Sequence, residues 1–510
     1  MKNRYIINVL LLTIGLQFTT SCKDEFLEVE PIGTSLEANY YRNAEEAFNG
    51  LVAAYDAVYW VGGFNTKVAV ANAASDDCLG GGGGGTDMQT LLVMNSFDLD
   101  PSLGPQGDLW AKGFAGIFRC NVLLAKLPEA EMDANLKSRF VAETKFLRAF
   151  YYFDLIRFFQ NIPLFTEPVS TAEMYNVVQV ERNLVFEQIE KDLTEAIPDL
   201  PTTVPIATEG GRATEGAARA LLGKVYLHQE KFDLASDQFE MVNGTPGATS
   251  EFGYSLLDNY ADLWDVSNKY NSESIFEIGH TSKSNGEWGC TGCTEGNVYN
   301  VNTGPRGYTI LDADVGAPEL SSGWSFNPIT QDLVDEFISQ GNEYDPRYKS
   351  TVYNIDSLAQ AGVVSYIEGG ENTGYFIAKF AGKTEDVSTG GGNFELNFPQ
   401  NMYEIRLADT YLMEAEALVR GGGDAARAQA LLDAVRARVG LGSVPATFEN
   451  IFHERRIELA TEGHRWFDLL RTGQAADALS PMGFVEGKHE FLPIPLLELS
   501  NTSLEQDPAY

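Results

Sequence analysis

Apolar residues recur at intervals of three and four over much of the chain, which is the pattern of amphipathic helices. The clearest segments are residues 37–60, 110–127, 136–165 and 184–201. Proline ends two of them, because Pro163 follows one apolar run and Pro198 interrupts the next. The pattern therefore predicts a mostly helical first half.

Two segments resemble the helix pairs of tetratricopeptide repeats, in which small and large residues alternate so that two antiparallel helices pack closely. The first is residues 212–242, with Leu222, Gly223, Tyr226, Phe232, Ala235 and Phe239 at the repeat spacing. Arg219 stands where the repeat has Trp. A looser copy covers residues 406–440 and has an extra residue in its glycine turn. Repeats bury their faces against neighbours, so further degenerate helix pairs are expected earlier in the chain.

Residues 451–473 predict one helix with an apolar stripe beside an ionic stripe. The ionic stripe contains Arg455, Glu458, Glu462 and Arg465. Two carboxylates one turn apart suggest acid/base chemistry, but each has an arginine at a spacing that favours an ion pair along the same helix. A structural, charge-paired helix is the favoured interpretation.

Helical periodicity largely fails between residues 249 and 400, where Gly, Asn, Ser, Thr and aromatic residues dominate. The aromatic residues in this polar region include Trp288, Tyr299, Tyr308 and Trp324. Such rings either anchor a loop to the body or form a ligand platform. A run of six glycines, residues 80–85, predicts a flexible surface loop because glycine favours neither helix nor strand.

Charge and composition narrow the classes of partner. The 510 residues are 44% hydrophobic and 21% charged, as in a folded soluble protein, and the formal net charge is −36. Binding to nucleic acid needs clustered Lys and Arg, so nucleic acid is not an expected partner. The same charge argues against a basic patch that adsorbs to anionic lipid.

The N-terminus has the order of an export signal. Lys2 and Arg4 precede an apolar run, and small residues then lead to Cys22. This arrangement resembles a bacterial lipoprotein signal, which predicts that residues 1–21 are removed and Cys22 is lipidated; Thr19 departs from the usual aliphatic residue. An ordinary secretion signal is the alternative. The apolar run is too short for a permanent membrane span.

The other four cysteines are expected in two states. Cys290 and Cys293 form a CxxC pair, which predicts a small disulfide in an oxidising compartment; zinc is the alternative, although no second ligand pair has the right spacing. Cys78 and Cys120 are predicted to be unpaired thiols.

Catalytic signatures are poor. The sequence HERRI at His453 lacks the second histidine of a zinc protease motif, and no GxSxG elbow occurs. A glycosidase needs only two carboxylates, so that class stays open. No cofactor and no dedicated metal site are expected; the acidic turn at Asp312 is compatible with an incidental surface calcium ion only.

Several blocks in a fixed order resemble the SusD/RagB family of outer-membrane nutrient-binding lipoproteins. They are AETKFLRAFYYFDLIRFF with NIPL, GRATEGAARALLGKVYL, RLADTYLMEAEAL, ERRIELATEGHRWFDLLR and the closing LPIPLLEL. The resemblance covers residues 22–510 and implies a mostly α, SusD-like fold. That fold has a helical scaffold with tetratricopeptide-like pairs and a loop-rich ligand-binding region with a few short strands. We divide the single domain into residues 22–245, a variable part at 246–400, and a C-terminal part at 401–510.

The resemblance also implies a non-enzymatic role. Such a lipoprotein would sit on the cell exterior, anchored in the outer membrane by lipid, capture an oligosaccharide and deliver it to a TonB-dependent transporter of the SusC type. Peptide uptake by the same architecture is the alternative, and a glycoside hydrolase is a further one.

Ligand residues of the family vary too much to carry over, so the candidates rest on residue type and loop position. Sugar rings stack on aromatic faces, and their hydroxyl groups need carboxylates, amides or arginine. The candidates are Trp288, Tyr299 and Trp324 for stacking, with Asp76, Asp77, Asn300, Arg306 and Tyr308 as polar partners.

Overall fold

The computed structural model describes residues 40–510, apart from 60–63, 171, 339–342 and 501. The predicted export signal and Cys22 lie outside the described residues. The long helices of the first half are α2 (Ala44–Tyr59), α3 (Phe64–Ala73), α4 (Gln89–Ser96), α5 (Gln106–Lys126), α6 (Ala134–Phe158), α7 (Arg182–Ala196), α9 (Glu215–His228) and α10 (Phe232–Asn243). Those of the C-terminal part are α15 (Leu407–Gly421), α16 (Ala425–Arg438), α17 (Phe448–Glu458) and α18 (Arg465–Arg471).

Shorter elements complete the chain. The short helices are α8 (Ile206–Glu209), α11 (Tyr299–Thr303), α12 (Gln331–Glu336), α13 (Tyr348–Thr351), α14 (Ile355–Gln360), α19 (Ala475–Leu479) and α20 (Leu496–Leu499). The strands are β1 (Ser274–Ile278), β2 (Thr309–Ile310), β3 (Val352–Asn354), β4 (Val364–Ser365), β5 (Tyr375–Ile377) and β6 (Met402–Arg406). The predicted mostly α fold with a few short strands is confirmed.

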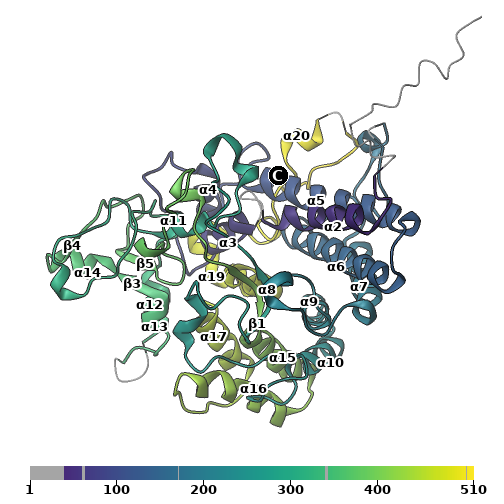
Figure 1. Ribbon diagram of the computed structural model, residues 1–510. Coiled ribbons are helices and arrows are strands. Elements are labelled where there is room, and N and C mark those ends of the chain that lie inside the picture. The colour runs from purple at the N-terminus through teal and green to yellow at the C-terminus, as the bar shows by residue number, and fades with distance from the viewer. Residues whose placement is uncertain (1–39, 60–63, 171, 339–342, 501) are drawn as a thin grey trace, which may run out of the picture.

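Long helices pack in a row that follows chain order. The packed neighbours are α5 with α6, α6 with α7, α7 with α9, α9 with α10, α10 with α15, and α15 with α16 and α17. Figure 1 shows the early helices on one side, α15 to α17 below them, and the short-stranded region with β3, β4 and α14 on the other side. The row joins the N-terminal and C-terminal parts into one scaffold.

Both predicted tetratricopeptide-like pairs form, as α9 with α10 and as α15 with α16. Gly223 on α9 explains the close approach in the first pair. A Cβ atom added there would lie 2.7 Å from Cε1 of Phe239, which is fully buried on α10. The small residue at this position therefore lets the large ring of the neighbouring helix pack.

Three antiparallel two-stranded sheets order the region that lacks helical periodicity. They pair β1 with β6, β2 with β4, and β3 with β5. β6 is buried along its whole length, so the β1–β6 sheet belongs to the main core. The other two sheets enclose a smaller core around Tyr308, Ile355 and Phe376. The loop-rich region thus packs partly in the main core and partly around this smaller core.

The prediction of one helix over residues 451–473 is wrong. α17 ends at Glu458, and α18 starts only at Arg465. Between them Thr461 and Gly463 adopt positive φ values of 69° and 81°. A Cβ atom at Gly463 would lie 3.1 Å from the Cα atom of Val68, so glycine also permits close contact with α3. The turn redirects the chain and aims the ionic side chains at distant segments.

The four side chains of the predicted ionic stripe do not pair with one another along one helix. Glu458 accepts from Arg347 and Arg406, and Glu462 accepts from Arg406 and from Nζ of Lys379. Arg465 pairs with Asp76. The network ties the C-terminal helices to β6 and to the loop-rich region, which confirms a structural role but corrects the expected pairing within the helix.

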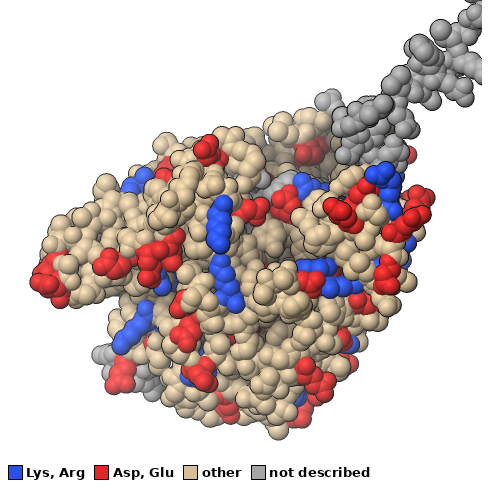
Figure 2. Space-filling model, in the orientation of Figure 1, with Lys and Arg blue, Asp and Glu red and all other residues tan. Residues whose placement is uncertain are grey.

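Several further expectations concern cysteines and surface charge. Cys290 and Cys293 form a disulfide, and Cys78 and Cys120 are buried free thiols, as predicted. On the face shown in Figure 2, acidic side chains are widely spread with Lys and Arg among them. Within the described part of the chain, no helix combines the length and apolar character that a bilayer crossing requires.

Candidate functional site

Two of the predicted aromatic residues meet at the surface. The ring centroids of Trp288 and Trp324 lie 5.7 Å apart, and the ring planes differ by 31°. Trp288 is 46% exposed, and Trp324 is half-buried against the main core. Two large, mutually tilted indole rings thus form an aromatic platform, our name for this pair, and Trp288 opens it to solvent.

Backbone pairing holds Trp324 in place. Its N–H donates to the carbonyl of Val301 at 2.8 Å, and the N–H of Ser325 donates to the carbonyl of Gly304 at 2.8 Å. The backbones of Gly304 and Gly323 touch, because a Cβ atom at Gly323 would lie 2.3 Å from the Gly304 oxygen. These contacts fasten the Trp324 segment to α11, which is itself buried.

A different loop carries Trp288. Its N–H donates to Oδ1 of Asn393 at 3.2 Å, and the N–H of Cys290 donates to the Glu287 carbonyl at 2.9 Å. The Cys290–Cys293 disulfide closes the same short turn. Asn393 and the disulfide therefore determine where the exposed indole of Trp288 stands.

Arg306 lies next to the platform. Its Nη2 donates to the Trp324 carbonyl at 3.1 Å and to Oδ2 of Asp87 at 2.8 Å, while its Nε has no hydrogen-bond partner. The Arg306 and Asp87 side chains are 32% and 41% exposed. A guanidinium group that contacts the backbone of Trp324, together with its paired carboxylate, supplies directional partners for ligand hydroxyl groups.

The glycine run brings Asp87 to this place. Gly82 donates to the Ser325 carbonyl and accepts from the N–H of Gly370, both at 2.8 Å. Gly81 and Gly82 are buried with positive φ values, so the expectation of a flexible surface loop is wrong for this half. Gly83 and Gly85 are exposed, and Gly83 donates to Oδ2 of Asp87. Glycine is needed because Phe326 and Ser325 leave no space for side chains.

Three predicted ligand residues belong to the interior instead. Tyr299 is fully buried and its hydroxyl contacts Asn72 and Asn327, and burial raises the pKa of this phenol. Asn300 is 3% exposed and donates to the Phe380 carbonyl and to Gln400. These two predictions are corrected because α11 packs into the core.

Tyr308 is likewise a core residue. It is 7% exposed, lies in the smaller core, and its hydroxyl donates to the Pro318 carbonyl at 2.8 Å. Its ring anchors the loop-rich region, which is the alternative that the sequence left open for such aromatic residues.

Asp76 and Asp77 serve the scaffold. Asp76 accepts two hydrogen bonds of 2.8 Å from Arg465, and Asp77 accepts from Nε of Arg456 at 2.8 Å. Burial alone raises the pKa of Asp76, but the hydrogen bonds and charge of Arg465, together with the charge of Arg456, outweigh it and lower the pKa. Both carboxylates are committed to arginine, so neither is offered to a ligand.

Sequence reasoning missed Asp87 and Asn393. Asp87 has a weak signal, because it ends a glycine run that brings the backbone close to another loop. Asn393 follows a second glycine run, residues 390–392, and nothing in its spacing connects it with Trp288. Only the fold shows that these segments support the platform.

Metal binding finds no support in this geometry. Among the described residues, no group of three His, Cys, Asp or Glu side chains is placed to hold a metal ion. Asp312, at the acidic turn considered for calcium, accepts from the N–H of Asp314 and begins a short helical turn.

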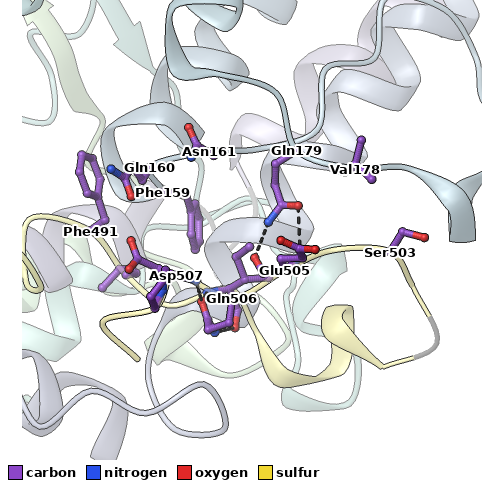
Figure 3. A pocket seen from close by; sticks show the side chains of 13 residues that line it. Phe159, Gln160, Asn161, Val178, Gln179, Phe491, Ser503, Glu505, Gln506 and Asp507 are labelled. Atoms are coloured by element: carbon purple, nitrogen blue, oxygen red, sulfur yellow. Dashed lines mark hydrogen bonds between the residues drawn. The ribbon is translucent and has the colours of Figure 1, made fainter.

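Two cavities lie away from the aromatic platform. One of about 390 Å³, drawn in Figure 3, forms where the C-terminal segment crosses the end of α6. Amide side chains of Gln160, Asn161 and Gln179 line it, and Gln179 is tied to the backbone of Glu505. A groove of about 770 Å³ beside α5 is mainly apolar. Neither cavity includes a predicted ligand residue.

Comparison with known proteins gives two family matches. The model of the SusD family matches residues 272–491, and the model described as "Starch-binding associating with outer membrane" matches residues 90–227. Among curated proteins, the starch-binding protein SusD of Bacteroides thetaiotaomicron is 25% identical over 465 residues, which cover 81% of this chain and 77% of that protein.

Solved structures give stronger similarity. A "Laminarin binding SusD-like protein" is 50% identical, with a TM-score of 0.88, and the match covers 92% of this chain and all of that one. Surface glycan-binding protein A from Bacteroides thetaiotaomicron, in complex with laminarihexaose, is 26% identical with a TM-score of 0.81 and the same coverage.

Proposed function

The chain belongs to the SusD family, and we propose that it is a surface glycan-binding protein whose ligand is a laminarin-type glucan. One structural observation carries the proposal, namely the surface pair of exposed Trp288 and half-buried Trp324, whose ring centroids lie 5.7 Å apart on two separately anchored loops. The apolar faces of glucose rings pack on indole rings, which suits this platform. Arg306 and Asp87 would serve the hydroxyl groups from its edge.

The similar structures support this ligand class. The relative with 50% identity is described as laminarin-binding, and a more distant one was solved with laminarihexaose. These relatives are binding proteins by description. A platform of two aromatic rings suits capture of a sugar chain, because the apolar faces of the sugar rings pack on it. Non-enzymatic binding is therefore the proposal.

The family match supports a proposal for location and partner. We propose attachment to the outer membrane through a lipid on Cys22, with the protein on the cell exterior. Delivery of the glycan to a TonB-dependent transporter of the SusC type is the corresponding proposed role. The description "Starch-binding associating with outer membrane" supports this location.

Calorimetric titration with laminarin tests the ligand proposal. Replacement of either ring, Trp288→Ala or Trp324→Ala, removes one stacking surface and should cost about 1–2 kcal/mol, or about 5-fold to 30-fold in Kd. Tyr175→Ala is the control, because Tyr175 is also about half exposed but lines the groove beside α5.

If both tryptophan variants bind laminarin as tightly as the wild-type protein, the platform is not the laminarin site. A screen in which peptides bind and all glycans fail would favour peptide uptake instead. Release of reducing ends from bound laminarin over time would contradict the non-enzymatic role.

A further inference from the structure

Arg182 differs from every other arginine that the structure describes, because it has no ion pair. Each of the others lies within salt-bridge distance of at least one carboxylate. The guanidinium carbon of Arg182 lies 5.3 Å from the ring centroid of Phe186 and 4.8 Å from that of Phe491. A cation held between two aromatic rings, in a chain with twice as many acidic as basic residues, is unusual.

The position of Arg182 at the start of a helix is also unfavourable for a positive charge. It is the first residue of α7, where the helix dipole disfavours a positive charge. Burial alone lowers the pKa of Arg182 to about 10, and no carboxylate offsets this change. The side chain is thus partly removed from water without a counter-ion.

Arg182 lines a cavity of about 310 Å³ between the first repeat and the C-terminal part. The walls are partly apolar, with Phe186, Phe467, Leu470 and Phe491. Phe491 also borders the neighbouring cavity in Figure 3. The volume lies in the range of small-molecule sites, and apolar walls with a few polar groups are typical of them.

A second polar group in the cavity wall is also unsatisfied. Nδ1 of His228 lies 3.0 Å from the Lys224 carbonyl, but its buried Nε2 has no hydrogen-bond partner. Burial, followed by the charges of Arg471 and Arg157, keeps the pKa of this imidazole well below its usual range. The cavity therefore has positively charged arginine side chains around the neutral imidazole ring of His228.

The one acid at the cavity is held away from Arg182. Oε1 of Glu490 accepts from the N–H of Gly487 at 2.9 Å and makes no salt bridge with the arginine. Arg157 and Arg471 also line the cavity, but Asp154 and Glu416 already pair with them. Of the three arginines that line the cavity, Arg182 is the one without a carboxylate partner, so it is the one available to pair with a bound anion.

We propose that this cavity binds a small organic anion, whose carboxylate pairs with Arg182 and whose apolar body lies against Phe186 and Phe491. The site is separate from the aromatic platform and does not depend on glycan binding. A planar guanidinium group suits bidentate pairing with a carboxylate, and the surrounding rings suit an aromatic or alicyclic body.

Phenylacetate and its neutral analogue phenylacetamide are suitable probes on the full mature chain. We expect phenylacetate to bind at least tenfold more tightly, because only the anion pairs with Arg182. NMR titration supplies a local readout, since the chain has only five histidines and the His228 ring should shift on binding. Equal binding of the two probes, or no binding of phenylacetate, would overturn the proposal.

Substitutions of arginine test whether Arg182 causes the preference for phenylacetate. Arg182→Gln should abolish the preference for the anion, and Arg182→Lys should retain part of it. Arg219→Gln is the matched control, because Arg219 lies on α9, pairs with Glu215 and does not line the cavity. Unchanged phenylacetate affinity in Arg182→Gln would contradict the assignment. If that variant does not fold, the comparison of the two probes on the wild-type protein still tests whether the cavity prefers the anion. Laminarin affinity should stay the same throughout.

Discussion

Glu458 is held by three arginine side chains, and none of them lies on its own helix. Arg406 and Arg347 donate to it at 2.6 and 2.9 Å, and Arg438 makes a third, shorter contact. The carboxylate is fully buried. Burial raises the pKa of Glu458, but the charges of Arg438, Arg406 and Arg347 outweigh it and hold the pKa well below its usual range.

We predict that Glu458→Gln destabilises the protein by about 3–5 kcal/mol, because three buried cations lose a shared anion. Urea unfolding, monitored by circular dichroism, measures the change. Laminarin affinity of the folded variant should be unchanged, since Glu458 does not contact the platform.

Glu449→Gln provides the comparison, because Glu449 lies in the first turn of the same helix and is exposed. Its stability should change by less than about 0.5 kcal/mol. A larger effect of Glu458→Gln on laminarin affinity than on stability would mean that this carboxylate belongs to the ligand site.

At the scale of elements, the two supports of the platform differ in strength. Trp324 lies on a segment that is hydrogen-bonded to α11 and packed on the core. The Trp288 turn is held by the hydrogen bond that the Trp288 N–H donates to Asn393, by hydrogen bonds of the Gly286 backbone with Asn393 and Asn397, and by the disulfide that closes it. The disulfide therefore reduces the freedom of an exposed indole before ligand binds, which lowers the entropic cost of binding.

We predict that the double variant Cys290→Ser/Cys293→Ser binds laminarin about twofold to tenfold more weakly, or by about 0.5–1.5 kcal/mol, because its tryptophan must be ordered on binding. Global stability should change little, since the closed loop is very short and both cysteines are exposed. Calorimetric titration and thermal unfolding measure the two effects.

A reducing agent gives an internal control. It should bring the affinity of the wild-type protein to that of the double variant and leave the variant unchanged. Identical affinities of oxidised and reduced protein would show that the disulfide is not needed to position Trp288.

At the scale of the whole molecule, buried carboxylates hold the repeats, β6 and the C-terminal helices together. Glu458, Glu462, Asp409 and Asp468 are all buried and paired with arginine. For each, burial raises the pKa, but the nearby cations lower it further than burial raises it. Their ionised forms are therefore bound more strongly in the folded state than in the unfolded one.

We predict a steep loss of stability in acid. A group whose folded pKa is lowered contributes its full stabilisation above its unfolded pKa, near 4, and loses it as the pH falls towards the folded value. The free energy of unfolding should begin to fall below about pH 6.5, because burial lowers the pKa of His228, His280 and His464 and only the unfolded chain takes up protons on them there. The fall should become steeper below about pH 4.5, where the carboxylates take up protons in the unfolded chain. Glu277 and Glu414 oppose this trend, because burial raises the pKa of each.

Urea unfolding at a series of pH values measures this profile. In Glu458→Gln the acid-induced loss should be smaller than in the wild-type protein, since one strongly lowered group is missing. Parallel profiles for the two proteins would indicate that Glu458 does not contribute to the acid response.

Local pattern was sufficient for most of the scaffold. The period of apolar residues gave α5, α6 and α7, and the spacing around Gly223 gave the first helix pair, because both signals lie within one or two helices. The same approach failed at Gly463, where an apolar stripe continues through a turn. There the close contact with Val68, almost 400 residues earlier in the chain, determines the backbone conformation of the turn.

The sequence by itself determined the helices, the repeats, the cysteine pair and the family, since all of these are carried by residues close together in the chain. Only the tertiary structure decided which aromatic and charged side chains face solvent. Trp288 and Tyr299 stand in similar polar sequence, yet one lies at the surface and the other beneath α3. Burial depends on which distant segments pack together, and for the same reason the lone Arg182 could not be recognised from its neighbours in sequence.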